Sequence, residues 1–214
     1  GQIHPIYHAV YDFCVKEMSS FYLDILKDRL YTDARSSVSG RSSRTVLYEI
    51  LTTLVKILAP VLSFTCEEVW QMLGFSGSVH LENWPKLSPS HRRVELEERW
   101  EKFMGFREKV LKALEEKREK KEIGNSLEAE VELAVSKTDE RQFLGNFKED
   151  LPGLLLVSQA RISAEPGSGG ELRVSVSKVR GTKCERCWNY RESVGQNKEH
   201  PALCHRCTDV LKGV

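Results

Sequence analysis

The chain has 214 residues, of which 40 % are hydrophobic and 29 % are charged, and its formal net charge is +1. This length allows one large or two modest domains with a small appendage, and the composition is that of a soluble globular protein. The near-neutral charge excludes a global field that attracts polyanions, so any nucleic-acid site must be a local patch.

Neither a membrane span nor a secretion signal is visible. No run of 18 apolar residues occurs, which excludes a spanning helix. The start, Gly1-Gln2-Ile3-His4, lacks a basic region followed by an apolar one, and it lacks an initiating Met. We therefore expect the chain to start within a gene or to be a processed product.

Residues 5–30 predict one helix, because apolar side chains recur there at steps of three to five, from Ile6 to Leu30. Residues 31–45 differ. Six small hydroxyl residues and a glycine fall between 36 and 45, which indicates a connection. That connection carries Arg35, Arg41 and Arg44.

Two shorter helices are expected next. Apolar residues at helical spacing predict a second helix over 46–58, and Pro60 predicts a kink or a stop. Thr65 and Glu68 have the spacing of a capping box, so we expect the third helix to begin at Thr65 and to end near Gly74.

A long fourth helix follows a loop over 74–90. Ser88 with Pro89 predicts its start, since proline favours the first helical position. Residues 115–122 are all charged and are typical of a solvated helix face. Gly124 is the expected C′ residue, just beyond the end of this helix.

The hydrophobic period then changes to two. Alternation predicts strands over 127–135 and 171–179, and 154–162 is a further strand candidate. Residues 138–150 have a helical pattern, and the glycine-rich segment 166–170 indicates a tight loop.

Two Cys-x-x-Cys pairs close the chain, with sixteen residues between them. This spacing is typical of zinc sites in which four thiolates fill a tetrahedral coordination and leave no position for substrate. We therefore expect one structural Zn²⁺ and no catalytic residue in this chain. The pairs also favour a reducing compartment over a disulfide framework. The expected ligands are Cys184, Cys187, Cys204 and Cys207.

The predicted fold class is thus multi-domain, α plus α/β. A helical bundle over 1–124 is followed by a small α/β junction domain over 125–179 and a zinc module over 180–214.

The zinc module has a modest basic bias, with eight Lys and Arg against four Asp and Glu between 178 and 214. Trp188 and Tyr190 follow the first cysteine pair. Either one of them packs over the zinc site, or they form a stacking platform for an unpaired base. Arg186, between two ligands, is a candidate for contact with a base edge or a phosphate.

The segment Cys184-Glu-Arg-Cys187-Trp188-Asn189-Tyr190, followed by the second pair, resembles the C-terminal zinc element of bacterial-type isoleucyl-tRNA synthetases, a class I family. Three further segments resemble the helical anticodon-binding domain that the isoleucyl, valyl and leucyl enzymes share: 21–31, 58–62 and 67–70. Residues 121–129 resemble the junction that follows that domain. The resemblance covers nearly the whole chain, in the order of the family.

The resemblance implies a ligase that uses ATP to attach isoleucine to its tRNA. The His-x-Gly-His and Lys-Met-Ser-Lys-Ser signatures of the catalytic domain are absent from this sequence, and so is an editing domain. We therefore expect a fragment that is inactive alone, with ATP bound only in the missing catalytic domain. The implied partner is isoleucine tRNA, with no DNA and no membrane partner. We expect a cytoplasmic monomer, with the mitochondrial matrix as the alternative location.

On this resemblance the bundle grips the anticodon stem and the zinc module approaches the anticodon loop. Unstacked loop bases suit aromatic side chains, and the guanidinium fork suits phosphate oxygens. For the three arginines of the connection, solvated loop charges are the alternative. The implied RNA-binding residues are Trp188, Arg186, Tyr190, Arg35, Arg41 and Arg44.

Three other classes compete. A free-standing zinc module that binds RNA or protein is the main alternative. A zinc deaminase is suggested by His80-Leu-Glu82 and the second cysteine pair, but that assignment leaves the first pair idle. A four-cysteine DNA glycosylase needs an N-terminal proline, where this chain has Gly1.

Overall fold

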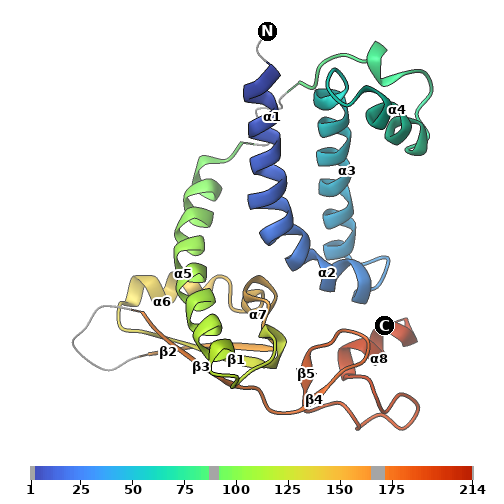
Figure 1. Cartoon of the computed structure of the whole chain (residues 1–214). Coiled ribbons are helices and arrows are strands. Elements are labelled where there is room, and N and C mark those ends of the chain that lie inside the picture. Colours follow the sequence, from blue (N-terminus) through green and yellow to red (C-terminus); the bar gives the residue numbers. More distant parts are fainter. Residues whose placement is uncertain (1–2, 87–91, 165–171, 214) are drawn as a thin grey trace. The chain divides into compact units, whose positions relative to one another are not determined.

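The computed structural model describes residues 3–86, 92–164 and 172–213 (Figure 1). The chain forms two compact units, Gly1–Arg93 and Val94–Val214. Among the described residues no helix is both long enough and apolar enough to cross a membrane.

A long helical segment opens the first unit. It consists of α1 (Ile3–Asp12), the π-helix η1 (Phe13–Tyr22) and α2 (Leu23–Thr32), which follow one another without a break. The N–H of Leu23 donates to the carbonyl of Met18, five residues earlier, which is the π-helical pattern. The helix expected over 5–30 is confirmed. The sequence pattern did not predict the π-helical turns in its middle.

The connection expected over 31–45 is wrong for most of its length, because α3 (Val38–Leu58) begins at residue 38. Ser37 is its N-cap, with a side-chain oxygen that accepts from the N–H of Gly40 at 3.0 Å. Hydroxyl groups inside the helix bond back to its own carbonyls; Ser43, for example, donates to the carbonyl of Ser39 at 2.8 Å. These hydroxyl groups therefore find hydrogen-bond partners within the helix and not in a turn.

The next helix, α4 (Ser63–Met72), begins before Thr65, and its N-cap Leu62 makes no side-chain cap hydrogen bond. The capping box is therefore wrong. The expected stop near Pro60 is confirmed, since α3 ends at Leu58. Apolar side chains of α3, α4 and the 3₁₀ turn η2 (Val79–Leu81) form a small core. Its buried members are Val55, Ala59, Cys66, Trp70 and Val79.

The second unit opens with α5 (Val94–Glu119). Its expected start at Ser88 and Pro89 lies outside the described residues. Gly124 is not the C′ residue, because the helix ends at Glu119 and Lys121 takes the left-handed conformation, with φ +57°. This helix packs against β3 and α7 of the same unit.

A three-stranded sheet with the order β2-β1-β3 is the centre of this unit. The central strand β1 (Ala129–Val135) pairs parallel with β2 (Gln159–Ala164) and antiparallel with β3 (Arg173–Lys178). Alternate residues of β1 are buried, as its period of two predicts. The 3₁₀ turn η4 (Ser126–Glu128) precedes the strand.

The crossover from β1 to β2 contains α6 (Thr138–Gly145) and α7 (Leu151–Leu155). The strand expected from residue 154 is therefore wrong at its start, because Pro152 opens a helical turn that ends at Leu156, with φ +57°. The expected glycine-rich loop over 166–170 lies outside the described residues.

The zinc module forms the red part of Figure 1, with the short hairpin β4 (Thr182–Lys183) and β5 (Tyr190–Arg191) and the helix α8 (His205–Lys212). A mainly helical chain with small sheets and a C-terminal cysteine cluster is thus confirmed. The three-part division into domains stays a prediction. Helix α5, which was assigned to the bundle, belongs to the compact unit of the sheet.

Candidate metal centre and nucleic-acid interface

Four buried thiols meet at one point of the zinc module. The Sγ atoms of Cys184, Cys187, Cys204 and Cys207 all lie within 4.8 Å of one another, and none forms a disulfide. The Sγ atoms of Cys187 and Cys204 are 3.8 Å apart. Tetrahedral zinc with Zn–S bonds of about 2.3 Å needs sulfur atoms about 3.8 Å apart. The residues present therefore fit a zinc ion.

Backbone hydrogen bonds shape the first cysteine pair into a knuckle. The N–H of Trp188 donates to the carbonyl of Cys184 at 2.8 Å, and the N–H of Cys184 donates to the carbonyl of Asn189 at 2.9 Å. The second pair stands at the start of α8, where the N–H of Cys204 points at the sulfur of Cys184, 3.4 Å away. Helix α8, which periodicity alone did not reveal, thus fixes two ligands.

The electrostatics of the cluster favour a bound cation. Burial raises the pKa of the Cys184 thiol, but backbone N–H groups, that of Cys187 foremost, outweigh it and lower the pKa to about 6. Burial also raises the pKa of the Cys207 thiol, and the neighbouring Cys187 adds to the rise. Because adjacent thiolates repel one another, a divalent ion is what allows all four to stay deprotonated.

Arg186 lies beside the metal centre. Its half-buried side chain hydrogen-bonds to the Cys207 thiol. A guanidinium in that place partly compensates the excess negative charge of four thiolates on one Zn²⁺. The RNA contact expected of Arg186 stays a prediction.

Trp188, which follows the first cysteine pair, is 60 % exposed. The partly buried side chains that pack on the cysteines are those of Val194 and Leu203. That Trp188 or Tyr190 packs over the metal stays an untested alternative. The backbone of Trp188 is left-handed, with φ +63°, which is unusual for a residue other than glycine. The ammonium of Lys183 lies 5.3 Å from the centre of its ring. Sequence reasoning missed Lys183, because only the hairpin brings it there.

Tyr190, by contrast, is half-buried in β5. Its backbone N–H donates to the hydroxyl of Ser158 at 2.7 Å. Its ring therefore offers less surface to a ligand than that of Trp188, and its RNA contact stays a prediction.

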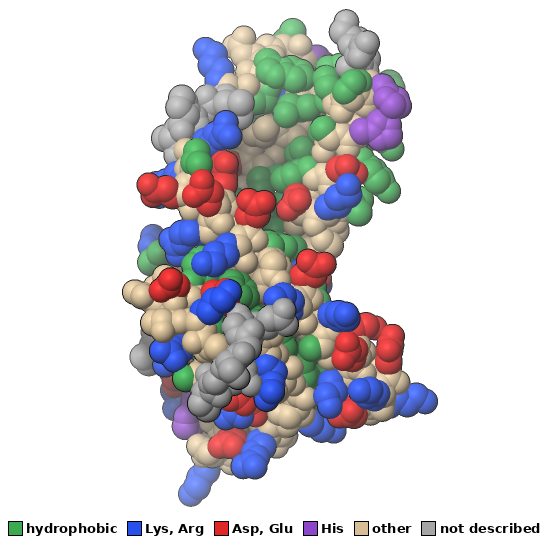
Figure 2. Space-filling model, turned by 90° about the vertical axis from the view of Figure 1, so that its left-hand side faces the viewer, with side chains coloured by type: hydrophobic (Ala, Val, Ile, Leu, Met, Phe, Trp, Pro, Cys, Tyr) green, Lys and Arg blue, Asp and Glu red, His purple; other side chains and the backbone are tan. Residues whose placement is uncertain are grey.

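Arg35, Arg41 and Arg44 are all exposed in the first unit, around the start of α3. Arg41 and Arg44 lie on the helix and not on a loop. The guanidinium of Arg44 donates to the carbonyl of Arg35 at 2.7 Å, which ties the helix to the residues before it. Acidic and basic side chains are interspersed on the face that Figure 2 draws, in keeping with the net charge of +1.

Comparison with known proteins decides the family. Residues 2–133 match the family described as "Anticodon-binding domain of tRNA ligase". The chain belongs to this family. Residues 181–210 match a second family, described as "Zinc finger found in FPG and IleRS", and that segment contains all four cysteines. The zinc module therefore holds a structural zinc.

Curated relatives of this anticodon-binding chain extend over nearly all of it. A protein named isoleucine–tRNA ligase from Syntrophotalea carbinolica is 46 % identical over 98 % of the chain. Proteins of the same name from Desulforamulus reducens and Thermotoga petrophila are 43 % and 42 % identical over 99 %. The chain spans 24 % of the length of each of these relatives. The resemblance predicted from the sequence is confirmed.

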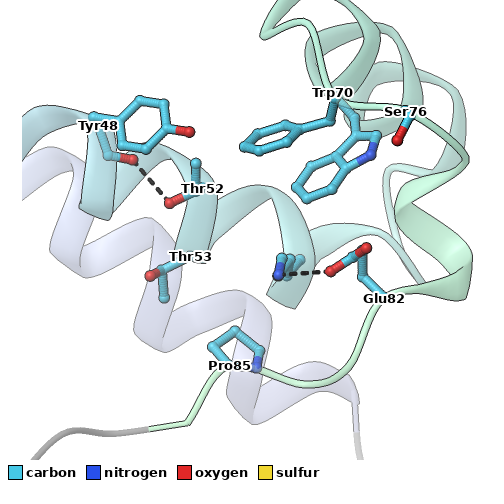
Figure 3. A pocket seen from close by; sticks show the side chains of 9 residues that line it. Tyr48, Thr52, Thr53, Trp70, Ser76, Glu82 and Pro85 are labelled. Atoms are coloured by element: carbon cyan, nitrogen blue, oxygen red, sulfur yellow. Dashed lines mark hydrogen bonds and ion pairs between the residues drawn. The ribbon is translucent and has the colours of Figure 1, made fainter.

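The anticodon-binding part also contains a cavity of about 430 Å³ in the first unit, next to α3 and α4 (Figure 3). Trp70 stacks on Phe75 with ring centres 4.0 Å apart, and its buried Nε1 has no hydrogen-bond partner among the residues that the structure describes. Lys56 forms a 2.9 Å ion pair with Glu82 and lies 5.2 Å from the Trp70 ring centre. Lys56 and Glu82 thus neutralise each other's charge at this cavity.

Proposed function

We propose that this chain is the tRNA-binding C-terminal portion of an isoleucine–tRNA ligase, and that it contacts the anticodon stem-loop of isoleucine tRNA. The family match of residues 2–133 supports the anticodon stem-loop as the target, and the relatives support isoleucine as the amino acid. The single observation that carries the RNA contact is the exposure of Trp188 on the knuckle that the first cysteine pair forms.

The surroundings of Trp188 suit an unstacked base. Trp188 is 60 % exposed, so much of the residue is accessible to a ligand. The ammonium of Lys183 lies over the ring, 5.3 Å from its centre, and places a positive charge beside the proposed site for a base. Stacking of a base on an aromatic side chain contributes about 1–3 kcal/mol. Loss of this ring therefore predicts a loss of affinity of about 5- to 150-fold.

The arginines around the start of α3 provide the second part of the proposed interface. Three exposed guanidinium groups lie on one short stretch of the first unit, and such groups pair with phosphate oxygens. Their contribution is independent of sequence and falls as the salt concentration rises. We therefore assign affinity to Arg35, Arg41 and Arg44, and base selection to the zinc module.

The chemistry of the whole protein is part of the same proposal. The complete ligase uses ATP to attach isoleucine to its tRNA, and its catalytic and editing domains lie outside these residues. The zinc takes part in no reaction step; it holds the knuckle that carries Trp188. We propose that the ligase acts as a monomer in the cytoplasm.

The experiment is to compare the affinities of isoleucine tRNA and of an unrelated tRNA for the chain at one fixed salt concentration. We expect tighter binding of isoleucine tRNA, and a preference that Trp188→Gly reduces while zinc stays bound. Equal affinity for both tRNAs, or the same preference in Trp188→Gly, contradicts the proposal. Equal affinity for both tRNAs is the result expected if the zinc module is instead an adaptor that binds protein.

A further inference from the structure

Ser158 joins three separate parts of the second unit. Its side chain is fully buried, with 0 % exposure, just before β2. Its hydroxyl donates to the carbonyl of Leu127, before β1, at 2.6 Å, and it accepts the N–H of Tyr190, in β5, at 2.7 Å. One oxygen atom therefore connects the start of two sheet strands with the hairpin of the zinc module.

The strand that Ser158 holds leads directly to Trp188. Tyr190 pairs with Lys183 across the β4–β5 hairpin. The ammonium of Lys183 lies over the Trp188 ring, and the N–H of Trp188 itself is fixed to the Cys184 carbonyl. A rotation of the hairpin relative to the sheet therefore carries the exposed ring with it.

The covalent link between the sheet and the hairpin is short but does not define an orientation by itself. Val179 donates to the carbonyl of Glu128 at 2.8 Å, which extends the sheet by one bond. Gly181 then turns the chain at φ +106°. A second attachment away from this turn is needed to prevent rotation about it, and the Ser158–Tyr190 hydrogen bond lies at such a place.

We propose that Ser158 is a positioning residue that locks the zinc module onto the sheet and so sets the direction in which Trp188 faces its ligand. The part of this inference that concerns RNA rests on the proposed function. The part that concerns the attachment of the zinc module to the sheet is independent of the proposed function. A hydroxyl suits the position because it donates and accepts at once, and a buried N–H or carbonyl without a partner is destabilising.

The test compares Ser158→Ala with Ser175→Ala, a matched control at an exposed serine of β3. We expect Ser158→Ala to retain zinc and to speed hydrogen exchange at the Tyr190 amide by about tenfold, as loss of a buried hydrogen bond predicts. Residual dipolar couplings should show that the sheet and the zinc module of Ser158→Ala no longer share one orientation. The affinity for isoleucine tRNA should fall by about three- to tenfold. Ser175→Ala should behave as the wild type in all of these measurements.

A second pair of variants approaches the bond from its other side. Tyr190→Pro removes the N–H and the ring, whereas Tyr190→Ala removes only the ring. We expect the loss of common orientation in Tyr190→Pro and not in Tyr190→Ala. If Ser158→Ala fails to fold, the comparison of Tyr190→Pro with Tyr190→Ala tests the locking role instead.

The outcomes separate the two proposals. Unchanged exchange at Tyr190 and unchanged dipolar couplings in Ser158→Ala overturn the locking role, whatever the tRNA does. A changed orientation with unchanged tRNA affinity overturns the role in RNA binding, provided that Trp188→Gly weakens binding. If Trp188→Gly leaves tRNA affinity unchanged, the proposed function fails, and the locking role is judged by exchange and orientation alone.

Discussion

Trp188 offers a test that separates the backbone of the metal knuckle from the side chain that it presents. At φ +63° the residue occupies the left-handed region, where a side chain costs about 1–2 kcal/mol relative to glycine. Glycine in turn loses about 0.4–1 kcal/mol through the greater freedom of the unfolded chain. We therefore expect Trp188→Gly to leave the zinc module about 0.5–1 kcal/mol more stable than Trp188→Ala does.

The two variants remove the same ring, so its other contributions cancel. Both lose the cation–π contact with Lys183, about 0.5–1 kcal/mol. Both lose whatever burial the ring has, which is limited because 60 % of the side chain is exposed. The difference between Gly and Ala thus reports the backbone conformation alone.

The assay is competition for zinc by a chelator at fixed pH. An advantage of about 0.5–1 kcal/mol makes the zinc-bound population of Trp188→Gly resist the chelator about two- to fivefold better than that of Trp188→Ala. Affinity for isoleucine tRNA should be weakened equally in both. If Trp188→Ala holds zinc as well as Trp188→Gly, or better, the strained backbone is not a property of the knuckle and this reasoning is refuted.

Three further predictions test other parts of the structure. Cys184→Ser should release zinc and unfold the zinc module while the helical circular dichroism of the rest of the chain is kept; an ordered module in nuclear magnetic resonance spectra contradicts this. Gly181→Ala should weaken zinc retention, because a Cβ there lies 2.5 Å from the backbone of Arg191; retention equal to the wild type shows that the turn can relax. The pKa of Glu67 in the folded chain is lowered, chiefly by the hydrogen bond from Gln71. The ionised carboxylate therefore stabilises the fold fully at pH above the ordinary pKa of glutamate. This stabilisation is lost as the pH falls through the lowered pKa of Glu67 in the folded chain. Thermal unfolding of Glu67→Gln should therefore depend less on pH in the acid range than that of the wild type, and an unchanged dependence excludes this contribution.

The metal ligands could be predicted because their signal is local. Two cysteines three positions apart form one knuckle, and a second pair completes the tetrahedron whatever the rest of the fold does. The alternation in 127–135 predicted β1 for a similar reason, since one face of the strand is buried.

Features that depend on distant partners were missed. Nothing in the sequence near Ser158 indicates that its hydroxyl meets both Leu127 and Tyr190. Lys183 likewise contacts Trp188 only through the hairpin. The start of α3 was placed too late for a different reason: small hydroxyl residues usually favour turns, but here Ser43 and its neighbours bond to carbonyls within the helix.

We propose that the zinc module presents Trp188 to the anticodon loop. Chemical probing of isoleucine tRNA bound to the wild-type chain and to Trp188→Gly tests it most directly. We predict that the wild-type chain protects bases of the anticodon loop, and that Trp188→Gly leaves at least one of them reactive while the stem remains protected. Protection confined to the acceptor arm, or an identical pattern with both proteins, contradicts the claim.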